Sequence, residues 1–328
     1  ADLDYYAATS EGEAMGLAGG FALSGKRPVV IMQNDGLGNA VNPISSLQQL
    51  YALPTLMIIT WRGEPGTKPD AAQHLMMGEI LTDLLGLMDI PYRVLEDDLD
   101  ATGQMVQEAK AHMEATQRPF ALIVRRGLLD GAPKIAPDTG KPMRLDHLRA
   151  MAELVDDKDI ILGTTGFTGR EVSSVFDNGP VFYMAGSMGC AASVGLALAL
   201  DNQDRRVFVL DGDGAVLMKL GTLATAGNYA PKNLFHVVFD NGLYESTGGQ
   251  NVPSRTVNFP GIARNAGYKV TDSLASVEAF KQALSTAKIG NGPVFWHLPI
   301  SSGTVADLPR PKASGEELRD RFMAKLGG

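Results

Sequence analysis

The stretch VFVLDGDGAVLMKLGTLATAGNYAPKNLFHVVFDNGLYES, residues 207–246, decides the fold. Its first apolar run, 207–211, lacks polar alternation, which is typical of a strand buried on both faces. Glycines at the end of this run let the backbone approach a ligand closely, and a helical pattern begins at once. A second buried strand, 235–240, follows that helix. Strand, helix and strand in this order predict a parallel sheet.

Polar side chains follow both strands, at the point where each strand ends. Asp213 lies within Gly-Asp-Gly, and Asn241 follows 28 residues later in Asn-Gly. Ligands in open parallel sheets bind at the carboxyl ends of the strands, so we expect these two side chains to lie together. A carboxylate, an amide oxygen, a backbone carbonyl and phosphate oxygens suit Mg²⁺, and a helix N-terminus suits a diphosphate. The alternative for a single Gly-Asp-Gly is a solvated acidic turn.

Short apolar runs alternate with helical patterns along the whole chain. This alternation predicts an α/β fold with two doubly wound parallel-sheet domains. Strands are expected over 29–33, 55–60, 92–95, 120–124, 160–163, 181–184, 207–211, 235–240, 268–270 and 294–298. Helices are expected over 11–24, 43–52, 73–87, 99–115, 145–156, 168–176, 188–200, 215–228 and 276–287, with a short charged helix at the C-terminal end.

One stretch interrupts this pattern near the middle of the chain. Residues 127–145, GLLDGAPKIAPDTGKPMRL, carry several Pro and Gly and little periodicity, which is typical of a linker. We therefore expect a first domain over 1–130, a linker over 131–150 and a second domain over 151–328.

Composition narrows the possible partners. The net charge of −8 leaves no basic field for nucleic acid or for a membrane surface. The one cysteine, Cys190, excludes an intrachain disulfide and fits a reducing cytoplasm. No apolar run reaches the roughly 18 residues of a spanning helix, and no signal peptide is recognisable. The chain begins ADLDYYAATSEGEA, without Met or an apolar strand, so we expect that residues precede it.

Residues 207–246 resemble the cofactor-binding motif of the thiamine diphosphate (TPP) enzyme superfamily. The resemblance implies a TPP and Mg²⁺ site, in which the Asp213 and Asn241 side chains and the Leu243 carbonyl bind the metal. It implies that the second domain binds the diphosphate and the first the pyrimidine. The further cofactor contacts expected in the motif are Gly212, Gly214, Ala215 and Tyr244.

Two more loops of the second domain are expected at the cofactor. Gly186, Ser187 and Met188 follow the strand over 181–184 and precede a helix rich in small residues. Met188 matches the large apolar residue that holds the cofactor bent in TPP enzymes; the alternative is a Met that fills a gap in the core. Thr165 and Gly166, with Thr164 before them, end the strand over 160–163 and offer hydroxyl and N–H groups.

The catalytic acid is expected in the first domain. TPP enzymes place a Glu beside N1′ of the pyrimidine, at the start of a helix with small residues and Gly-Tyr/Phe-Ala. The segment SEGEAMGLAGGFALSGKRPVVIM, 10–32, offers Glu11 and Glu13. Aligning its Gly-Phe-Ala with the family pattern puts Glu11 at the catalytic position, whereas the helix dipole explains Glu13. In the superfamily the two domains of one site come from different subunits, which implies a homodimer or a larger homo-oligomer.

Several segments resemble the phosphonopyruvate decarboxylase family: MQNDGLGNAVNP (32–43), WRGEPGTKPDAAQH (61–74), and 186–200 with 212–227 and 245–250. The resemblance implies decarboxylation of 3-phosphonopyruvate to phosphonoacetaldehyde and CO₂ in phosphonate biosynthesis. Sulfopyruvate decarboxylases share the motif around DNGLYESTGGQ, so sulfopyruvate is the alternative substrate. The chain departs from the expected pattern at Asp35, where the family carries Ser, and at Cys190, where it carries His.

An anionic substrate needs cations and N–H donors. Asn34, Asp35 and Gly36 lie in an expected loop after the strand over 29–33. Arg and Lys suit phosphoryl oxygens, and the alternative is an exposed charged loop. The candidates expected on a polar loop after the strand over 55–60 are Arg62, Lys68 and His74. Glu245 is either a proton relay or a solvated turn residue.

Other functions remain open at this point. A TPP-dependent carboligase usually has a middle domain, for which this chain has no room. A nicotinamide dehydrogenase would carry Gly-x-Gly-x-x-Gly after a strand, and GSMGCA, 186–191, matches only part of it. A non-catalytic TPP-fold protein should lack the pyrimidine acid or the metal pair, yet both are present.

Overall fold

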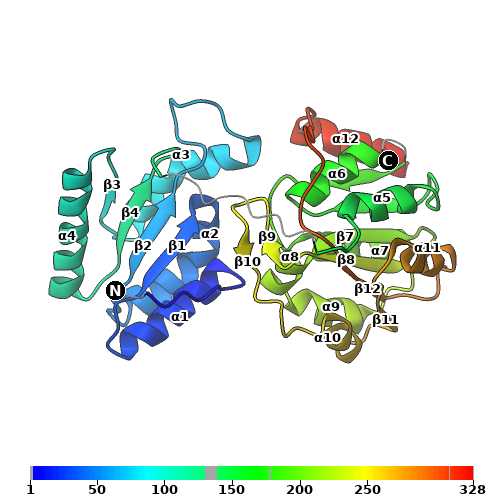
Figure 1. Cartoon of the computed structure of the whole chain (residues 1–328), viewed down its shortest axis with the longest axis horizontal. Helices are drawn as coiled ribbons and strands as arrows, with labels where there is room; N and C mark the ends of the chain where they lie inside the picture. The colour runs from blue at the N-terminus through cyan, green and yellow to red at the C-terminus, as the bar shows by residue number, and fades with distance from the viewer. Residues whose placement is uncertain (1–2, 130–138, 177–178, 310, 328) are drawn as a thin grey trace. The chain divides into compact units, whose positions relative to one another are not determined.

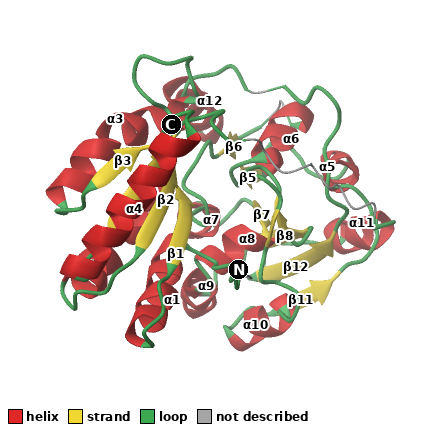
Figure 2. Cartoon of the chain, turned by 60° about the vertical axis from the view of Figure 1, so that its left-hand side comes forward, coloured by secondary structure: helices red, strands yellow, loops and turns green. Residues whose placement is uncertain are grey.

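The computed structural model describes residues 3–129, 139–176, 179–309 and 311–327. The chain divides into two compact units, Ala1–Ala132 and Pro133–Gly328. Each unit contains a parallel sheet with helices on both faces (Figures 1 and 2). The predicted α/β class with two doubly wound sheets is confirmed.

Unit 1 holds a four-stranded parallel sheet in the order β1-β2-β4-β3. Its strands are β1 (Val29–Gln33), β2 (Leu56–Thr60), β3 (Tyr92–Val94) and β4 (Phe120–Val124). Its helices are α1 (Glu11–Leu23), α2 (Asn34–Pro43), α3 (Ala72–Leu87) and α4 (Leu99–Thr116), with a π-helical turn over Ile44–Gln49.

Apolar side chains cover the sheet of unit 1 on both sides. Met15 of α1, Leu37 of α2 and Leu81 of α3 pack against one face, and Ala109 of α4 packs against the other. All of β4 is buried, as its continuous apolar sequence predicts. The apolar strand β1, in contrast, is exposed along one side of this chain.

Unit 2 holds a six-stranded parallel sheet in the order β11-β12-β8-β7-β5-β6. Its strands are β5 (Ile160–Gly163), β6 (Val181–Tyr183), β7 (Val207–Gly212), β8 (Leu234–Asp240), β11 (Val270–Ser273) and β12 (Val294–Pro299). A small antiparallel pair, β9 (Leu243–Tyr244) and β10 (Gln250–Asn251), follows β8.

The helices of unit 2 cover both faces of its sheet. They are α5 (Arg144–Ala152), α6 (Phe167–Val175), α7 (Ala191–Asp201), α8 (Asp213–Met218), α9 (Gly221–Tyr229), α10 (Phe259–Asn265), α11 (Val277–Ser285) and α12 (Gly315–Leu326). One core joins β7 to α7, α8, α9 and α10, and the other joins it to α5, α6 and α11. These two hydrophobic cores, one on each face of the sheet, therefore fix the positions of the strand ends that carry the motif.

The structure corrects several expected boundaries. The expected loop after β1 is helix α2, because Leu37 and Ala40 bury one of its faces. The expected helix over 43–52 is the end of α2 and a π-helical turn. The helix expected over 215–228 begins at Asp213 and is broken into α8 and α9 at Lys219 and Leu220.

Other differences lie at the edges of unit 2 and in the expected linker. β11 begins two residues later than expected, and the sequence reading missed α10, which the Asn258 side chain caps through the Gly261 N–H. α5 begins inside the expected linker, and residues 131–138 of that linker lie outside the described residues. Within the described part of the chain, no helix has the length and apolar character needed to cross a membrane.

Candidate active site

The two motif loops of unit 2 meet where β7 and β8 end. These strands pair in parallel with Gly212 opposite Phe239, so the two strands end at the same edge of the sheet (Figure 1). The Gly242 N–H donates a hydrogen bond to Oδ2 of Asp213 over 3.2 Å. The predicted proximity of Gly-Asp-Gly and Asn-Gly is therefore present in the fold.

Asp213 is a buried carboxylate, with 3% of its surface exposed. Burial raises the pKa of Asp213 well above its usual value, and the nearby Asp240 carboxylate raises it further. Burial also acts to raise the pKa of Asp240, but a hydrogen bond with His297 over 2.8 Å and one with Asp213 hold it below its usual value. No ion pair of Asp213 with Lys, Arg or His occurs among the described residues. A bound cation would offset this unfavourable charge.

Asn241 presents its amide in a defined orientation. Its Nδ2 donates to Oε2 of Glu245 over 3.1 Å, and its Oδ1 accepts from the Leu243 N–H over 3.0 Å. The amide oxygen keeps a second lone pair. The described residues contain no group of three or more His, Cys, Asp or Glu that could hold a metal. A metal at Asp213 would therefore need amide, carbonyl and ligand oxygens, as the sequence analysis expects.

The loops after β5, β7 and β8 line one pocket of unit 2 together with Met188. Of the predicted cofactor residues it is lined by Thr165, Met188, Gly212, Asp213, Gly214, Ala215, Asn241, Leu243 and Tyr244. Met188 lies in this lining and not in either described core, which speaks against the core-filling alternative. Gly166, Gly186 and Ser187 are not in the lining, although a Cβ on Gly166 would sit 3.0 Å from Oγ of Ser246, which is.

Two features of this pocket fit a phosphorylated ligand. The buried hydroxyl of Thr164 lines the pocket and has no hydrogen-bond partner among the described residues. Gly214 lets the first turn of α8 lie against Tyr244, because a Cβ there would approach the ring to 2.4 Å. The pocket thus combines a partnerless buried hydroxyl, a buried carboxylate and backbone that a larger residue would obstruct.

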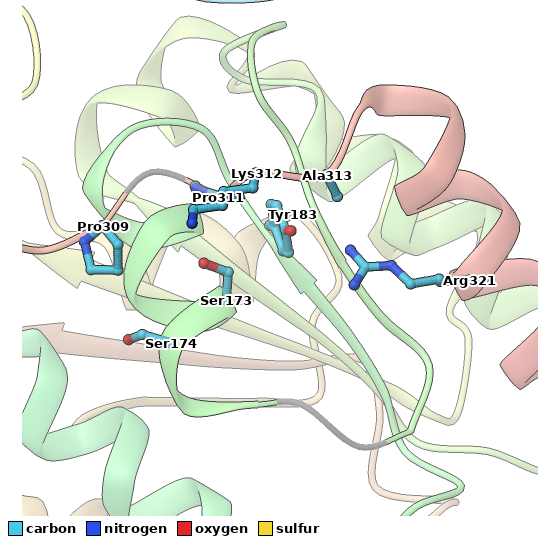
Figure 3. Close-up of a pocket in the computed structure, with 8 residues that line it drawn as sticks. All are labelled: Ser173, Ser174, Tyr183, Pro309, Pro311, Lys312, Ala313 and Arg321. Carbon is cyan, nitrogen blue, oxygen red and sulfur yellow. The ribbon is translucent and has the colours of Figure 1, made fainter.

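A second pocket of unit 2, of about 290 Å³, lies between α6, β6, α12 and the segment before α12 (Figure 3). Ser173, Ser174 and Tyr183 line it from one side and Arg321 from the other. It contains none of the residues predicted for cofactor or substrate.

The two acidic candidates of unit 1 have different surroundings. The exposed Glu13 accepts hydrogen bonds from the Thr9 N–H and hydroxyl, both over 2.6 Å, so it closes the first turn of α1. Glu11 instead packs against α2: Asn39 Nδ2 donates to its Oε2 over 3.0 Å, and Gly36 leaves room for its carboxylate. Glu13 therefore has a structural role at the start of α1. Its hydrogen bonds do not involve Glu11, which contacts α2 instead.

Replacing Gly36 by alanine is expected to reduce turnover strongly, by about a hundredfold, because the new Cβ would lie 2.3 Å from Oε1 of Glu11 and displace it. The matched control is Gly38→Ala in the same helix, where a Cβ meets nothing within 4 Å. Steady-state rates and thermal melts of both variants check this. Equal rates for the two variants would contradict the assigned packing around Glu11.

The predicted substrate residues of unit 1 are mostly engaged with each other. The Asn34 side chain donates to the Arg62 carbonyl and accepts from the Arg62 N–H, both over 2.9 Å. Asp70 accepts from Nε and Nη2 of Arg62, over 2.6 and 2.5 Å, which raises the Arg62 pKa and lowers that of Asp70. Asn34 is thus a structural link between two strand ends, and one edge of the Arg62 guanidinium is already occupied.

The remaining candidates differ in their surroundings. Asp35 and Gly36 belong to the first turn of α2, not to a loop. His74 lies in the first turn of α3, and its Nδ1 is 2.8 Å from Oδ2 of Asp35. Lys68 is exposed on the segment between β2 and α3. His74 and Asp35 therefore form a hydrogen-bonded pair, which their spacing in the sequence did not predict.

The chain matches known proteins over nearly its whole length. Residues 169–298 match the family model "Thiamine pyrophosphate enzyme, C-terminal TPP binding domain". The chain is 39% identical to a phosphonopyruvate decarboxylase of Streptomyces viridochromogenes over 338 residues, 98% of this chain and 84% of that one. The chain belongs to the phosphonopyruvate decarboxylase family. The resemblance of its motifs to TPP-dependent decarboxylases is confirmed.

Sulfopyruvate decarboxylases are also similar to this member of the phosphonopyruvate decarboxylase family. The chain is 27% identical to the sulfopyruvate decarboxylase of Methanosarcina acetivorans, over 97% of this chain and 87% of that one. It is 39% identical to sulfopyruvate decarboxylase subunit beta of Methanothermobacter thermautotrophicus, over 57% of this chain and 98% of that one.

Proposed function

We propose that this chain decarboxylates 3-phosphonopyruvate to phosphonoacetaldehyde and CO₂ with TPP and Mg²⁺. The observation that carries the proposal is the buried Asp213 carboxylate, which lines the pocket beside Asn241 without a cationic partner among the described residues. Phosphonopyruvate is favoured over sulfopyruvate because identity over nearly the full chain is 39% to the first enzyme and 27% to the second.

Unit 2 would hold the cofactor. The Asp213 carboxylate, Asn241 Oδ1 and the Leu243 carbonyl would bind Mg²⁺, and hydroxyl and N–H groups of the pocket would bind the diphosphate. The Thr164 hydroxyl is available for this, since it has no partner among the described residues. Met188 would support the apolar part of the cofactor from the pocket wall.

Bound TPP supplies the electron sink that makes loss of CO₂ from a 2-oxo acid possible. Glu11 would hold a proton at N1′ of the pyrimidine and exchange it during the reaction, a contribution of roughly 10²–10⁴ in rate for a positioned acid. Asn39 would keep this carboxyl in place through its hydrogen bond. Lys68, His74 and the free edge of Arg62 would attract the phosphonate group.

Each site would combine residues of two chains. We propose a homodimer or a larger homo-oligomer, as the resemblance to TPP enzymes implies. A reducing cytoplasm would suit the protein, because its one cysteine, Cys190, is free.

Parallel CO₂-release assays with phosphonopyruvate, sulfopyruvate and pyruvate test the proposed substrate. We expect much faster turnover of phosphonopyruvate in the presence of TPP and Mg²⁺, with an aldehyde as the second product. Preference for sulfopyruvate would overturn the substrate assignment but keep the cofactor site. Acetoin-like products from pyruvate would instead favour a carboligase.

A further inference from the structure

Asn241 can bind a metal only if its amide oxygen faces the metal. An asparagine side chain carries an acceptor at one end and two donors at the other, and the two ends have nearly the same shape. In this structure, Nδ2 of Asn241 donates to Glu245 Oε2 over 3.1 Å. A carboxylate only accepts hydrogen bonds, so Glu245 can face the Nδ2 end and not the oxygen. Glu245 therefore selects the orientation that turns Oδ1 away from it, and the Leu243 N–H, which donates to Oδ1 over 3.0 Å, selects the same orientation.

Glu245 is itself held from two sides. Its Oε1 accepts a hydrogen bond from the Gly303 N–H, and its Oε2 lies 3.7 Å from Nη2 of Arg144. Arg144 is buried on α5, and its Nε donates to the buried Glu171 of α6 over 2.8 Å. The guanidinium stays charged in proteins, so it attracts the Glu245 carboxylate and helps to hold it in place. One buried arginine thus ties two helices to the loop that carries Asn241.

The Arg144 guanidinium also faces the pocket. Arg144 and Glu245 both line it, and Nη2 of Arg144 is buried without a hydrogen-bond partner among the described residues. The cluster carries two carboxylates, Glu171 and Glu245, and one cation, Arg144. The net formal charge of this cluster is therefore negative.

We propose that Glu245 is a positioning residue that presents Asn241 as an oxygen ligand to Mg²⁺, and that Arg144 holds Glu245 in place. This inference rests on the proposed function, because it takes Asn241 as a metal ligand. Removing partners that orient metal ligands typically lowers metal affinity by about 10–100-fold. The proposed role differs from a proton relay, which would leave metal affinity unchanged.

The direct test is Glu245→Gln. Glutamine keeps the size of the side chain but can donate as well as accept, so only the Leu243 N–H still selects the orientation of the Asn241 amide. We expect the Mg²⁺ concentration for half-maximal TPP binding, measured by calorimetry on the full chain, to rise at least about tenfold. Glu153→Gln is the matched control, because Glu153 is exposed and pairs with Lys281. Thermal melts without cofactor verify folding, and Glu245→Ala carries the same expectation if Glu245→Gln does not fold.

The double variant Asn241→Asp, Glu245→Gln separates orientation from other roles. Aspartate has an oxygen at both ends, so its orientation no longer matters, and the double variant should recover most of the Mg²⁺ affinity that Glu245→Gln loses. An unchanged Mg²⁺ dependence in Glu245→Gln, whatever its turnover, would overturn the inference. So would a double variant as weak as Glu245→Gln. If the wild-type chain does not bind TPP with Mg²⁺, the proposed function fails first.

Discussion

Replacing Glu11 by glutamine is expected to lower CO₂ release from phosphonopyruvate by at least about a hundredfold, the usual contribution of a positioned acid. Glutamine has nearly the same shape and can still accept the hydrogen bond that Asn39 donates to Oε2. It cannot, however, hold an exchangeable proton at N1′ of the cofactor. TPP binding measured by calorimetry should therefore remain close to that of the wild-type chain while turnover is lost.

Glu13→Gln is the matched control for this experiment. Glu13 lies two residues away on the same helix, but it is exposed and accepts its hydrogen bonds from Thr9. Its replacement should cost about 1 kcal/mol of stability, which is typical of losses at helix caps. A Glu11→Gln chain with a near-wild-type rate, or a Glu13→Gln chain that loses activity instead, would show that the acid has been misassigned.

Replacing Asp213 by asparagine is expected to have opposite effects on cofactor binding and on stability. The loss of its charge should weaken Mg²⁺-dependent TPP binding by more than about a hundredfold, because a buried ligand carboxylate contributes strongly to a hard-cation site. The variant without cofactor should be at least as stable as the wild-type chain. Asparagine can still accept the Gly242 N–H bond, and it removes a buried charge.

The pH dependence of this stability difference has a definite sign. Burial and Asp240 raise the pKa of Asp213 in the folded chain above its unfolded value, so ionisation is less favourable in the folded state. The penalty is absent below the unfolded pKa, near 3.8, and grows as the pH rises. The stability advantage of Asp213→Asn without cofactor should therefore be larger at pH 8 than at pH 5.

Unfolding curves at both pH values and TPP titrations check these effects, with Asp204→Asn as a control because Asp204 is exposed. Retained Mg²⁺-dependent affinity in Asp213→Asn would rule out Asp213 as a metal ligand. If Asp213→Asn without cofactor were less stable than the wild-type chain at both pH values, the buried Asp213 charge would not destabilise the fold, contrary to this prediction.

The sheets could be predicted from sequence because their physical signal is local. The strands β7 and β8 are continuous apolar runs, and both lie within one residue of their expected bounds. Parallel pairing then brings Asp213 and Asn241 to one edge, so their proximity follows from the pattern alone. The start of α1 at Glu11 was also predicted, because a helical pattern begins there, whereas the catalytic role of Glu11 stays a prediction.

Helix α2 could not be predicted because its residues favour a loop. Its glycines and asparagines are weak helix formers, and tertiary packing of Leu37 overrides that preference. Gly36 is needed there for the approach of Glu11, a contact between different helices that leaves no periodic signal.

The ion pairs of the candidate site could not be predicted from the sequence either. Arg144 lies in a segment that reads as a linker, yet the fold places it between Glu171 and Glu245. The predicted substrate cation Arg62 is bound by Asp70, which no motif singled out. Such partners depend on side-chain positions in three dimensions, and neither hydrophobic period nor motif spacing encodes them.

The most direct test of the account is CO₂ release from phosphonopyruvate by the full chain after its cofactor and metal have been removed. We predict no release with TPP alone or with Mg²⁺ alone, and full turnover when both are restored. Release without TPP, or no release although calorimetry shows that TPP and Mg²⁺ are bound, would contradict the account.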